Sequence, residues 1–262
     1  MKCIYAVILF PFFLHSCQSR NKKEDALFSM ENITRANLQT ITVEVEDFNF
    51  EDLGNFLEVT SYIQLAAEPL LASIQEIQIK NEKIYIHDKF ARIICYDMQG
   101  KMIFKIDAKG AGPGEYTDVN TFVINEQSRE LIIYDNHKQS LLFYNADNGI
   151  FFKTQKLVKP DPTAMASLGG VYYYDNRYHS NYPNDTDLYY SLLVSKNAMT
   201  MDRHYFPHND AESSYRFRPT RQPFSYNDSV LYYCRNFDNV IYELNPDSLK
   251  ALYKICLLYT SD

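Results

Sequence analysis

A glycine-rich stretch from Lys109 to Tyr116 (KGAGPGEY) has the residue types that can hold a phosphate group against backbone amides. Its glycines permit unusual backbone angles and the close approach of a ligand: Gly110, Gly112 and Gly114. A phosphate-binding loop also needs a helix N-terminus after it, which supplies further amides and a dipole. Neither Gly-Lys-Ser/Thr nor a helical pattern follows Tyr116, so the phosphate interpretation is not favoured.

A structural role suits this glycine-rich stretch better. Pro113 fixes a turn, and the carboxylate of Glu115 can accept hydrogen bonds from exposed backbone amides. We expect the stretch to carry the chain from the outer strand of one sheet to the inner strand of the next. A ligand contact is the alternative, because such a crossover runs inward, and its residues would be Gly112, Gly114 and Glu115.

Three aspartates at strand ends, Asp88, Asp135 and Asp175, could form a ring of carboxylates for calcium binding or acid catalysis. They occupy equivalent positions in successive repeats, however, and such repetition is typical of a turn or strand-end hydrogen bond within each repeat. Calcium would need several oxygen ligands that converge on one point, and no Asp-rich loop of that kind is present. We therefore predict structural roles for all three.

The histidine and serine patterns give no catalytic constellation. His204 and His208 are four residues apart, but Pro207 between them opposes the helix that a paired metal site would need. The Gly-x-Ser-x-Gly elbow of serine hydrolases does not occur, and neither does a Cys-x-x-Cys pair. The sequence therefore predicts no catalytic residue, no metal site and no cofactor.

A tyrosine-rich region is the best sequence candidate for a binding surface. Tyr172 to Tyr174 lie in a hydrophobic run, and we expect them to pack in the core and between repeats. The following polar stretch, Asn176 to Asp187, reads as an inserted loop. Tyrosine offers a flat apolar face with a polar tip, which suits stacking on sugars or contact with a protein. The predicted ligand contacts in this loop are Arg177, Tyr178, His179 and Tyr182.

The first residues predict export and a lipid anchor. Lys2 precedes an apolar run from Ile4 to Leu14, which at about 1.5 Å per residue is too short to span a bilayer and fits a signal peptide over residues 1–16. Leu14-His15-Ser16-Cys17 resembles the bacterial lipobox, which implies cleavage before Cys17 and lipid attachment to it. Ordinary secretion with Cys17 as a bystander is the alternative. Residues 17–40 begin with a charged stretch and are expected to be a tether.

Composition limits the class of partner. The 262-residue chain is 46% hydrophobic and 15% aromatic, with no tryptophan, so it can build a core rich in strands. Its formal net charge is −7, and no basic region is present to attract phosphate backbones. Nucleic acid is therefore excluded as an expected partner.

Recurring strand pairs are the elements that must position these residues. The first strand of the pair recurs at Lys83–Asp88, Glu130–Asp135, Gly170–Asp175 and Ser229–Cys234. The second ends in an Asp/Asn turn suited to a hairpin, at Ile93–Gly100, Leu141–Gly149 and Ile241–Asp247. Repetition every 40 to 50 residues or so, with four strands per unit, is typical of a β-propeller. Further strands are expected at 41–45, 58–65, 74–79 and 121–125, the last two being inner strands.

These repeats, together with the Tyr-Asp-x-x-Gly turn and the motif Lys109 to Tyr116, resemble the six-bladed β-propeller lipoproteins of Bacteroides and relatives. That family is related in form to NHL-repeat propellers. The resemblance covers residues 41–255 and implies an all-β fold of four-stranded antiparallel blades, of which about four of six are present. It implies a cell-envelope location, lipid-anchored to the outer membrane on its periplasmic or surface face, with no other membrane contact.

The last seven residues, 256–262 (CLLYTSD), resemble one reading frame of a transposon end used to prepare sequencing libraries. A genuine edge strand is the alternative, since the composition suits a strand. We expect an adapter origin for this tail and an incomplete propeller over residues 41–255.

Two functional classes follow from the sequence. The first is a binding module that presents one face to a glycan, a peptide or an envelope protein partner. The alternative is a propeller lyase or lactonase with a metal in the central channel. That enzyme would need convergent His, Asp or Glu side chains on the inner strands. Two inner strands can be assigned from the sequence, and they are mainly apolar, with Gln75, Glu76 and Gln78 as the polar exceptions. Binding is therefore favoured, and the enzyme class stays open.

Overall fold

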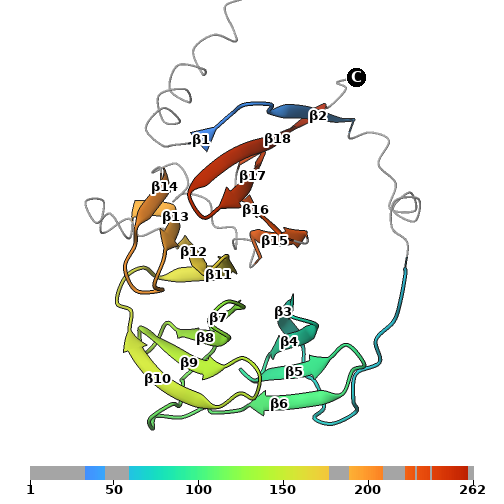
Figure 1. Ribbon diagram of the computed structural model, residues 1–262, viewed down its shortest axis with the longest axis vertical. Coiled ribbons are helices and arrows are strands. Elements are labelled where there is room, and N and C mark those ends of the chain that lie inside the picture. The colour runs from blue at the N-terminus through green and yellow to red at the C-terminus, as the bar shows by residue number, and fades with distance from the viewer. Residues whose placement is uncertain are drawn as a thin grey trace, which may run out of the picture.

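The computed structural model describes residues 33–44, 59–176, 189–208, 222–227, 229–236 and 238–258. In these ranges the regular elements are all strands, and they form three four-stranded sheets and one six-stranded sheet. Figure 1 shows the sheets placed around a common axis as the blades of a propeller, with β3, β7, β11 and β15 innermost. The predicted all-β propeller of four-stranded antiparallel blades is confirmed, with four blades in the described residues.

The first two blades are regular up-and-down sheets. Blade 1 contains β3 (Ile74–Lys80), β4 (Lys83–Asp88), β5 (Ile93–Asp97) and β6 (Met102–Ile106). Blade 2 contains β7 (Thr121–Asn125), β8 (Glu130–Asp135), β9 (Ser140–Asn145) and β10 (Phe151–Lys156). In each, every strand pairs antiparallel with the next one along the chain. The two inner strands predicted from sequence are confirmed as β3 and β7.

The other two blades follow the same order. Blade 3 contains β11 (Pro162–Leu168), β12 (Val171–Asn176), β13 (Tyr190–Ser195) and β14 (Arg203–Pro207). Blade 4 contains β15 (Phe224–Asn227), β16 (Val230–Cys234), β17 (Val240–Asn245) and β18 (Ser248–Leu258). Two N-terminal strands extend blade 4 by pairing parallel with β18, namely β1 (Ile33–Thr34) and β2 (Gln39–Glu44).

The core lies between the blades, because the middle strands of blades 1 to 3 are buried on both faces and those of blade 4 on one. Alternation of side chains along β12 places Tyr172 and Tyr174 against blade 2, and it places Tyr173 against blade 4. The blade 3–blade 4 interface adds further aromatic side chains, including Tyr233 and Tyr242, both with no exposed area. The predicted packing role of Tyr172 to Tyr174 is confirmed.

One predicted strand is wrong. Residues 59–65 of the expected strand 58–65 form no β-ladder, although their sequence alternates. This segment lies instead as extended chain against the face of blade 1 that is turned away from blade 2, where Ile63 and Leu65 pack on Ile84 and Tyr96. A β-strand needs a hydrogen-bonding neighbour strand as well as alternating residues. This segment packs on the face of the sheet and not along its edge, so it has no such neighbour.

Candidate functional site

Three of the inner strands, β3, β11 and β15, line a cavity of about 300 Å³ at the centre of the propeller (Figure 1). Strand β3 contributes the consecutive residues Glu76 to Lys80, and β11 contributes Ala164 and Met165. The third side is formed by Gln222 and by Phe224 to Tyr226 of β15. This volume lies at the small end of the range for ligand pockets, and the walls combine apolar and polar groups as such pockets do.

The alternation of β3 gathers its polar residues on one face. Glu76, Gln78 and Lys80 stand two residues apart, so all three project toward blade 2. The intervening Ile77 and Ile79 project to the opposite face and are 44% and 59% exposed. A strand that alternates in this way presents a carboxyl, an amide and an ammonium group in a row beside the channel.

Glu76 is the titratable group of greatest interest. Its Oε1 accepts a hydrogen bond from Gln78 Nε2 at 2.8 Å, and its Oε2 accepts one from Thr121 Oγ1 at 3.4 Å. Burial raises the pKa of Glu76 to about 7, because desolvation penalises the carboxylate more than these hydrogen bonds favour it. The side chain therefore changes its protonation state near neutral pH, where an ordinary glutamate is fully ionised.

Gln78 fixes the position of Glu76 and joins two blades. Its Nε2 donates to the carboxyl of Glu76 and also to the backbone oxygen of Phe122 on β7, at 2.7 Å. A side-chain amide with two acceptors in a partly buried position cannot rotate freely. The Glu76 carboxyl is thus held by groups from both β3 and β7.

Lys80 joins the inner strands at the carboxyl-terminal end of β3. Its buried ammonium lies 3.4 Å from Glu126 Oε2, just after β7, and 3.4 Å from the ring centroid of Tyr226 on β15. The Tyr226 hydroxyl donates to the backbone oxygen of Ser167 and accepts from its amide, at 3.1 Å and 3.0 Å. Burial lowers the pKa of Lys80, and Glu126 partly offsets this. These contacts connect all four blades around one end of the cavity.

The arrangement suits the binding of a small group that carries both polar and apolar surface. Glu76 and Gln78 supply hydrogen-bonding groups, and Met165 and Phe224 supply apolar wall. In the described ranges, no group of three or more His, Cys, Asp or Glu side chains is placed to hold a metal ion.

The glycine-rich stretch forms the predicted crossover, from the outer strand β6 to the inner strand β7. Glu115 Oε2 accepts from the Gly112 amide at 2.6 Å, as expected for a carboxylate that caps exposed amides. Tyr144 donates to the backbone oxygen of Gly114 at 2.8 Å, and Lys138 donates to that of Glu115 at 2.8 Å. These loop groups bond within the chain, and a ligand contact by Gly112, Gly114 and Glu115 stays a prediction.

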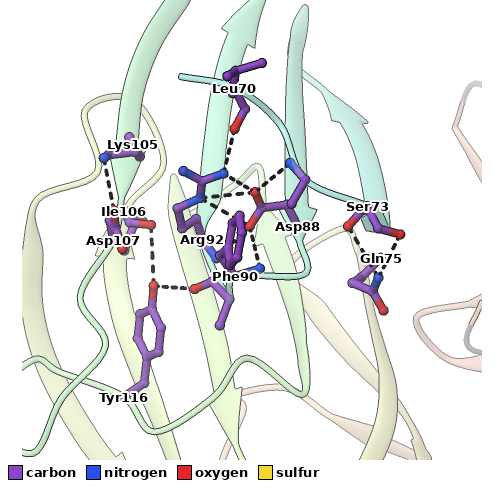
Figure 2. A network of polar contacts seen from close by, with 12 residues as sticks. Leu70, Ser73, Gln75, Asp88, Phe90, Arg92, Lys105, Ile106, Asp107 and Tyr116 are labelled. Carbon is purple, nitrogen blue, oxygen red and sulfur yellow. Dashed lines mark hydrogen bonds and ion pairs between the residues drawn. The ribbon is translucent and has the colours of Figure 1, made fainter. Parts of the chain in front are cut away.

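Asp88 organises the turn between β4 and β5, as Figure 2 shows. Its carboxylate accepts from the amides of Ala72, Phe90 and Arg92 at 3.0–3.3 Å and forms an ion pair with the Arg92 guanidinium. Arg92 also donates to the backbone oxygen of Leu70 at 2.8 Å. Burial alone would raise the pKa of Asp88, but the hydrogen bonds from Arg92 and the amides hold it below its ordinary value.

The other two strand-end aspartates also bond within the fold. Asp135 accepts from the amides of Thr117, His137 and Lys138 at 2.6–3.1 Å. The predicted strand-end roles of Asp88 and Asp135 are therefore confirmed.

Asp175 differs from Asp88, because in the described residues no arginine forms an ion pair with its carboxyl. Its oxygens accept from Thr163 Oγ1 at 2.5 Å and from the Tyr233 hydroxyl of blade 4 at 2.8 Å. Burial raises the pKa of Asp175. Equivalent positions of the repeat therefore differ: Asp88 of blade 1 forms an ion pair, and Asp175 of blade 3 is a buried carboxyl that accepts from two hydroxyl groups.

The remaining sequence candidates lie outside the described residues: Cys17, Arg177, Tyr178, His179 and Tyr182. Within the part of the chain that is described, no helix has the length and apolar character needed to cross a bilayer. Sequence reasoning noted Glu76 and Gln78 only as exceptions, and it missed Lys80 and Tyr226. Glu76, Gln78 and Lys80 could have been found from their spacing, since they alternate with apolar residues on a predicted inner strand.

The fold is similar to that of known structures. A protein of Bacteroides fragilis NCTC 9343 that is described as exported shares 17% sequence identity and a TM-score of 0.66, over 84% of this chain. This chain spans 60% of the length of that protein. A member of the DUF4221 family from Bacteroides vulgatus shares 12% identity and a TM-score of 0.48, over 76% of this chain and 62% of its own.

At these identities, the first likeness shows the fold alone. A search of curated proteins finds no match. A family model described as Domain of unknown function (DUF4934) matches residues 38–260, which is most of the chain. This chain therefore belongs to the DUF4934 family.

Proposed function

We propose that this chain is the propeller of a cell-envelope lipoprotein that acts as a binding module and takes its ligand, a glycan, a peptide or part of an envelope protein, in the central cavity. The lipobox-like residues that end in Cys17 support an anchor in the outer membrane, and the exported neighbour from Bacteroides fragilis supports a place outside the cytoplasm. The proposed natural form is a six-bladed propeller related to NHL repeats.

The central cavity is the observation that carries this proposal. Its walls come from three different blades, so a ligand there would contact β3, β11 and β15 together. Polar groups with fixed positions, Glu76 and Gln78, stand beside the apolar side chains of Met165 and Phe224. Pockets of this composition are typical of small-molecule and side-chain recognition.

Filling the cavity should abolish binding. Ile77 lines the cavity and is 44% exposed, so a tryptophan at this position can occupy the cavity without entering the packed core. Ile77→Trp is expected to weaken binding to glycan or peptide arrays by roughly tenfold or more. The matched control is Ile103→Trp, since Ile103 is 40% exposed but lies on the outer strand β6. Wild-type binding by Ile77→Trp would place the ligand elsewhere.

The tyrosine-bearing loop is the proposed second contact. Array binding that is lost in a Tyr178→Ala, Tyr182→Ala double variant, but kept in Ile77→Trp, would move the site from the cavity to this loop. No binding to any array by the wild-type protein would leave envelope proteins as the partners to test, by cross-linking in intact cells.

The lipid anchor has its own test. Metabolic labelling with a fatty-acid analogue should mark the wild-type protein and leave Cys17→Ser unlabelled, because the thiol that starts lipidation is then absent. The Cys3→Ser variant is the control, since Cys3 lies in the expected signal peptide and should not affect labelling. Equal labelling of the wild type and Cys17→Ser would rule out the anchor.

A further inference from the structure

We propose that the central cavity recognises its ligand through an ammonium group, which pairs with the carboxylate of Glu76. This inference rests on the proposed function, because it assigns a chemical class to a ligand of that same cavity. It follows from the charges around Glu76, from the way its carboxyl is held and from the apolar surface beside it.

Among the described residues, Glu76 has hydrogen-bond donors but no ion-pair partner. In the described part of the chain, its carboxyl accepts from the neutral groups of Gln78 and Thr121, and no ion pair includes it. Asp88 shows the contrasting case, in which Arg92 neutralises a buried carboxylate. A carboxylate that is desolvated without such a partner is costly, so a ligand cation that enters the cavity would restore the missing charge.

The ion pair between Lys80 and Glu126 does not neutralise Glu76. On β3 the ammonium of Lys80 is already paired with Glu126 at 3.4 Å, so these two charges balance. On β4 the buried His87 lies opposite Glu76 in the ladder. The lining residues of β11 are uncharged, and on β15 the phenol of Tyr226 bonds to Ser167. Apart from any charge on His87, the ionised Glu76 is therefore the unbalanced charge among the described residues of this lining.

The cavity also offers a place for the carbon skeleton of an amine. Met165 and Phe224 form apolar wall, while the Tyr226 ring faces Lys80. A space of about 300 Å³ holds one sugar ring or one extended side chain, so the ammonium could belong to an amino sugar or to a lysine side chain. Both sources present the same group to Glu76, and experiment can separate them.

The pairing predicts a definite dependence of affinity on pH. Burial raises the pKa of Glu76 to about 7, and an ammonium ligand binds only the ionised form. Affinity should therefore rise as pH increases through 7 and then level off. The fraction of ionised Glu76 sets the size of this change, which is roughly thirtyfold between pH 5.5 and pH 8.5. A neutral ligand that accepts a hydrogen bond from the protonated carboxyl would show the opposite trend.

Calorimetric titration of the purified full chain tests the inference with two matched pairs of probes. The sugar pair is 6-amino-6-deoxyglucose and glucose, and the peptide pair is Nα-acetyl-lysinamide and its Nε-acetylated form. The ammonium group of the lysine probe stays protonated over the pH range used. At least one amine is expected to bind roughly tenfold or more tightly than its neutral partner, and the pair that does so identifies the source.

The variant Glu76→Gln keeps the shape of the side chain and should lose both the preference for the amine and the pH dependence. Glu82→Gln removes the same charge from an exposed turn and should change neither. In a protein with ¹³C-labelled glutamate side chains, the bound amine should also lower the pKa of the Glu76 carboxyl.

Three results would overturn the inference: equal binding of the amines and their neutral partners, unchanged binding by Glu76→Gln, or no binding of either amine. None of these refutes the proposed function while Ile77→Trp abolishes array binding. If Ile77→Trp also has no effect, the cavity itself is not the site.

Discussion

Replacing Asp88 with asparagine is expected to destabilise the protein by about 3–5 kcal/mol, because it leaves the Arg92 guanidinium without its buried partner. The Asp88 side chain has no exposed area, and that of Arg92 is 13% exposed. The carboxylate also accepts from three backbone amides in and beside the β4–β5 turn. Urea unfolding at pH 7, followed by circular dichroism, measures the loss.

The matched comparison is Asp175→Asn, at the equivalent position of blade 3. Asp175 accepts from the hydroxyl groups of Thr163 and Tyr233, and both can adapt to an amide. Its pKa is raised by burial, so the uncharged asparagine removes a desolvation cost at neutral pH. We expect a change within about 1 kcal/mol. Equal losses in the two variants would contradict this division of roles.

The two variants should also differ in their dependence on pH. The pKa of Asp88 is lower in the folded than in the unfolded state, so its contribution is present above about pH 4 and is lost as pH falls through the folded pKa. The loss in free energy of unfolding caused by Asp88→Asn should therefore become smaller at acidic pH. The pKa of Asp175 is raised in the folded state, so the wild type loses stability relative to Asp175→Asn as pH rises above about 4.

Replacing Gly100 with alanine is expected to cost about 3 kcal/mol or more, from backbone strain and from lost packing. Gly100 has a φ of +78°, and a Cβ there would lie 2.0 Å from the backbone oxygen of Gln64. Backbone atoms cannot rotate aside as a side chain can. The segment around Gln64, residues 59–65, would therefore leave blade 1. This would remove the contacts of Ile63 and Leu65 and the hydrogen bond from the Ala66 amide to the backbone oxygen of Gly100.

Gly169→Ala is the matched control for this prediction. Gly169 also has a positive φ, of +57°, but an added Cβ would meet only Pro246 Cγ, at 3.4 Å. It should cost only the backbone strain, about 1 kcal/mol. Limited proteolysis should cut Gly100→Ala between residues 59 and 73 faster than it cuts the control. Similar stabilities and similar cleavage would show that the segment is not held where the structure places it.

Much of the fold was predictable because its signals are local. The strand from Lys83 to Asp88 and its counterpart from Glu130 to Asp135 are short runs of strand-favouring apolar residues that end in a turn residue, and this pattern depends only on neighbours in the chain. The segment 59–65 shows the limit of such evidence. Its alternating residues favour a strand, but a strand forms only where a free sheet edge is available.

The candidate site was less predictable because its contacts join distant parts of the chain. Glu76 and Gln78 are visible in the sequence as polar residues of an inner strand, but their partners Thr121 and Phe122 lie on the next blade. The contact of Lys80 with the ring of Tyr226 crosses from the first blade to the fourth. No local pattern contains that information.

By itself, then, the sequence determined the recurring strand pairs, the four-stranded grouping and the repetition that makes a propeller, since these depend on local strand preference and turn chemistry. Only the tertiary structure decided that Glu76 lies desolvated beside a cavity, and that Asp88 forms an ion pair with arginine while Asp175 forms none with the described residues. The physical reason is that solvation and charge pairing are set by what surrounds a side chain in space. For residues on inner strands, those surroundings come mostly from other blades.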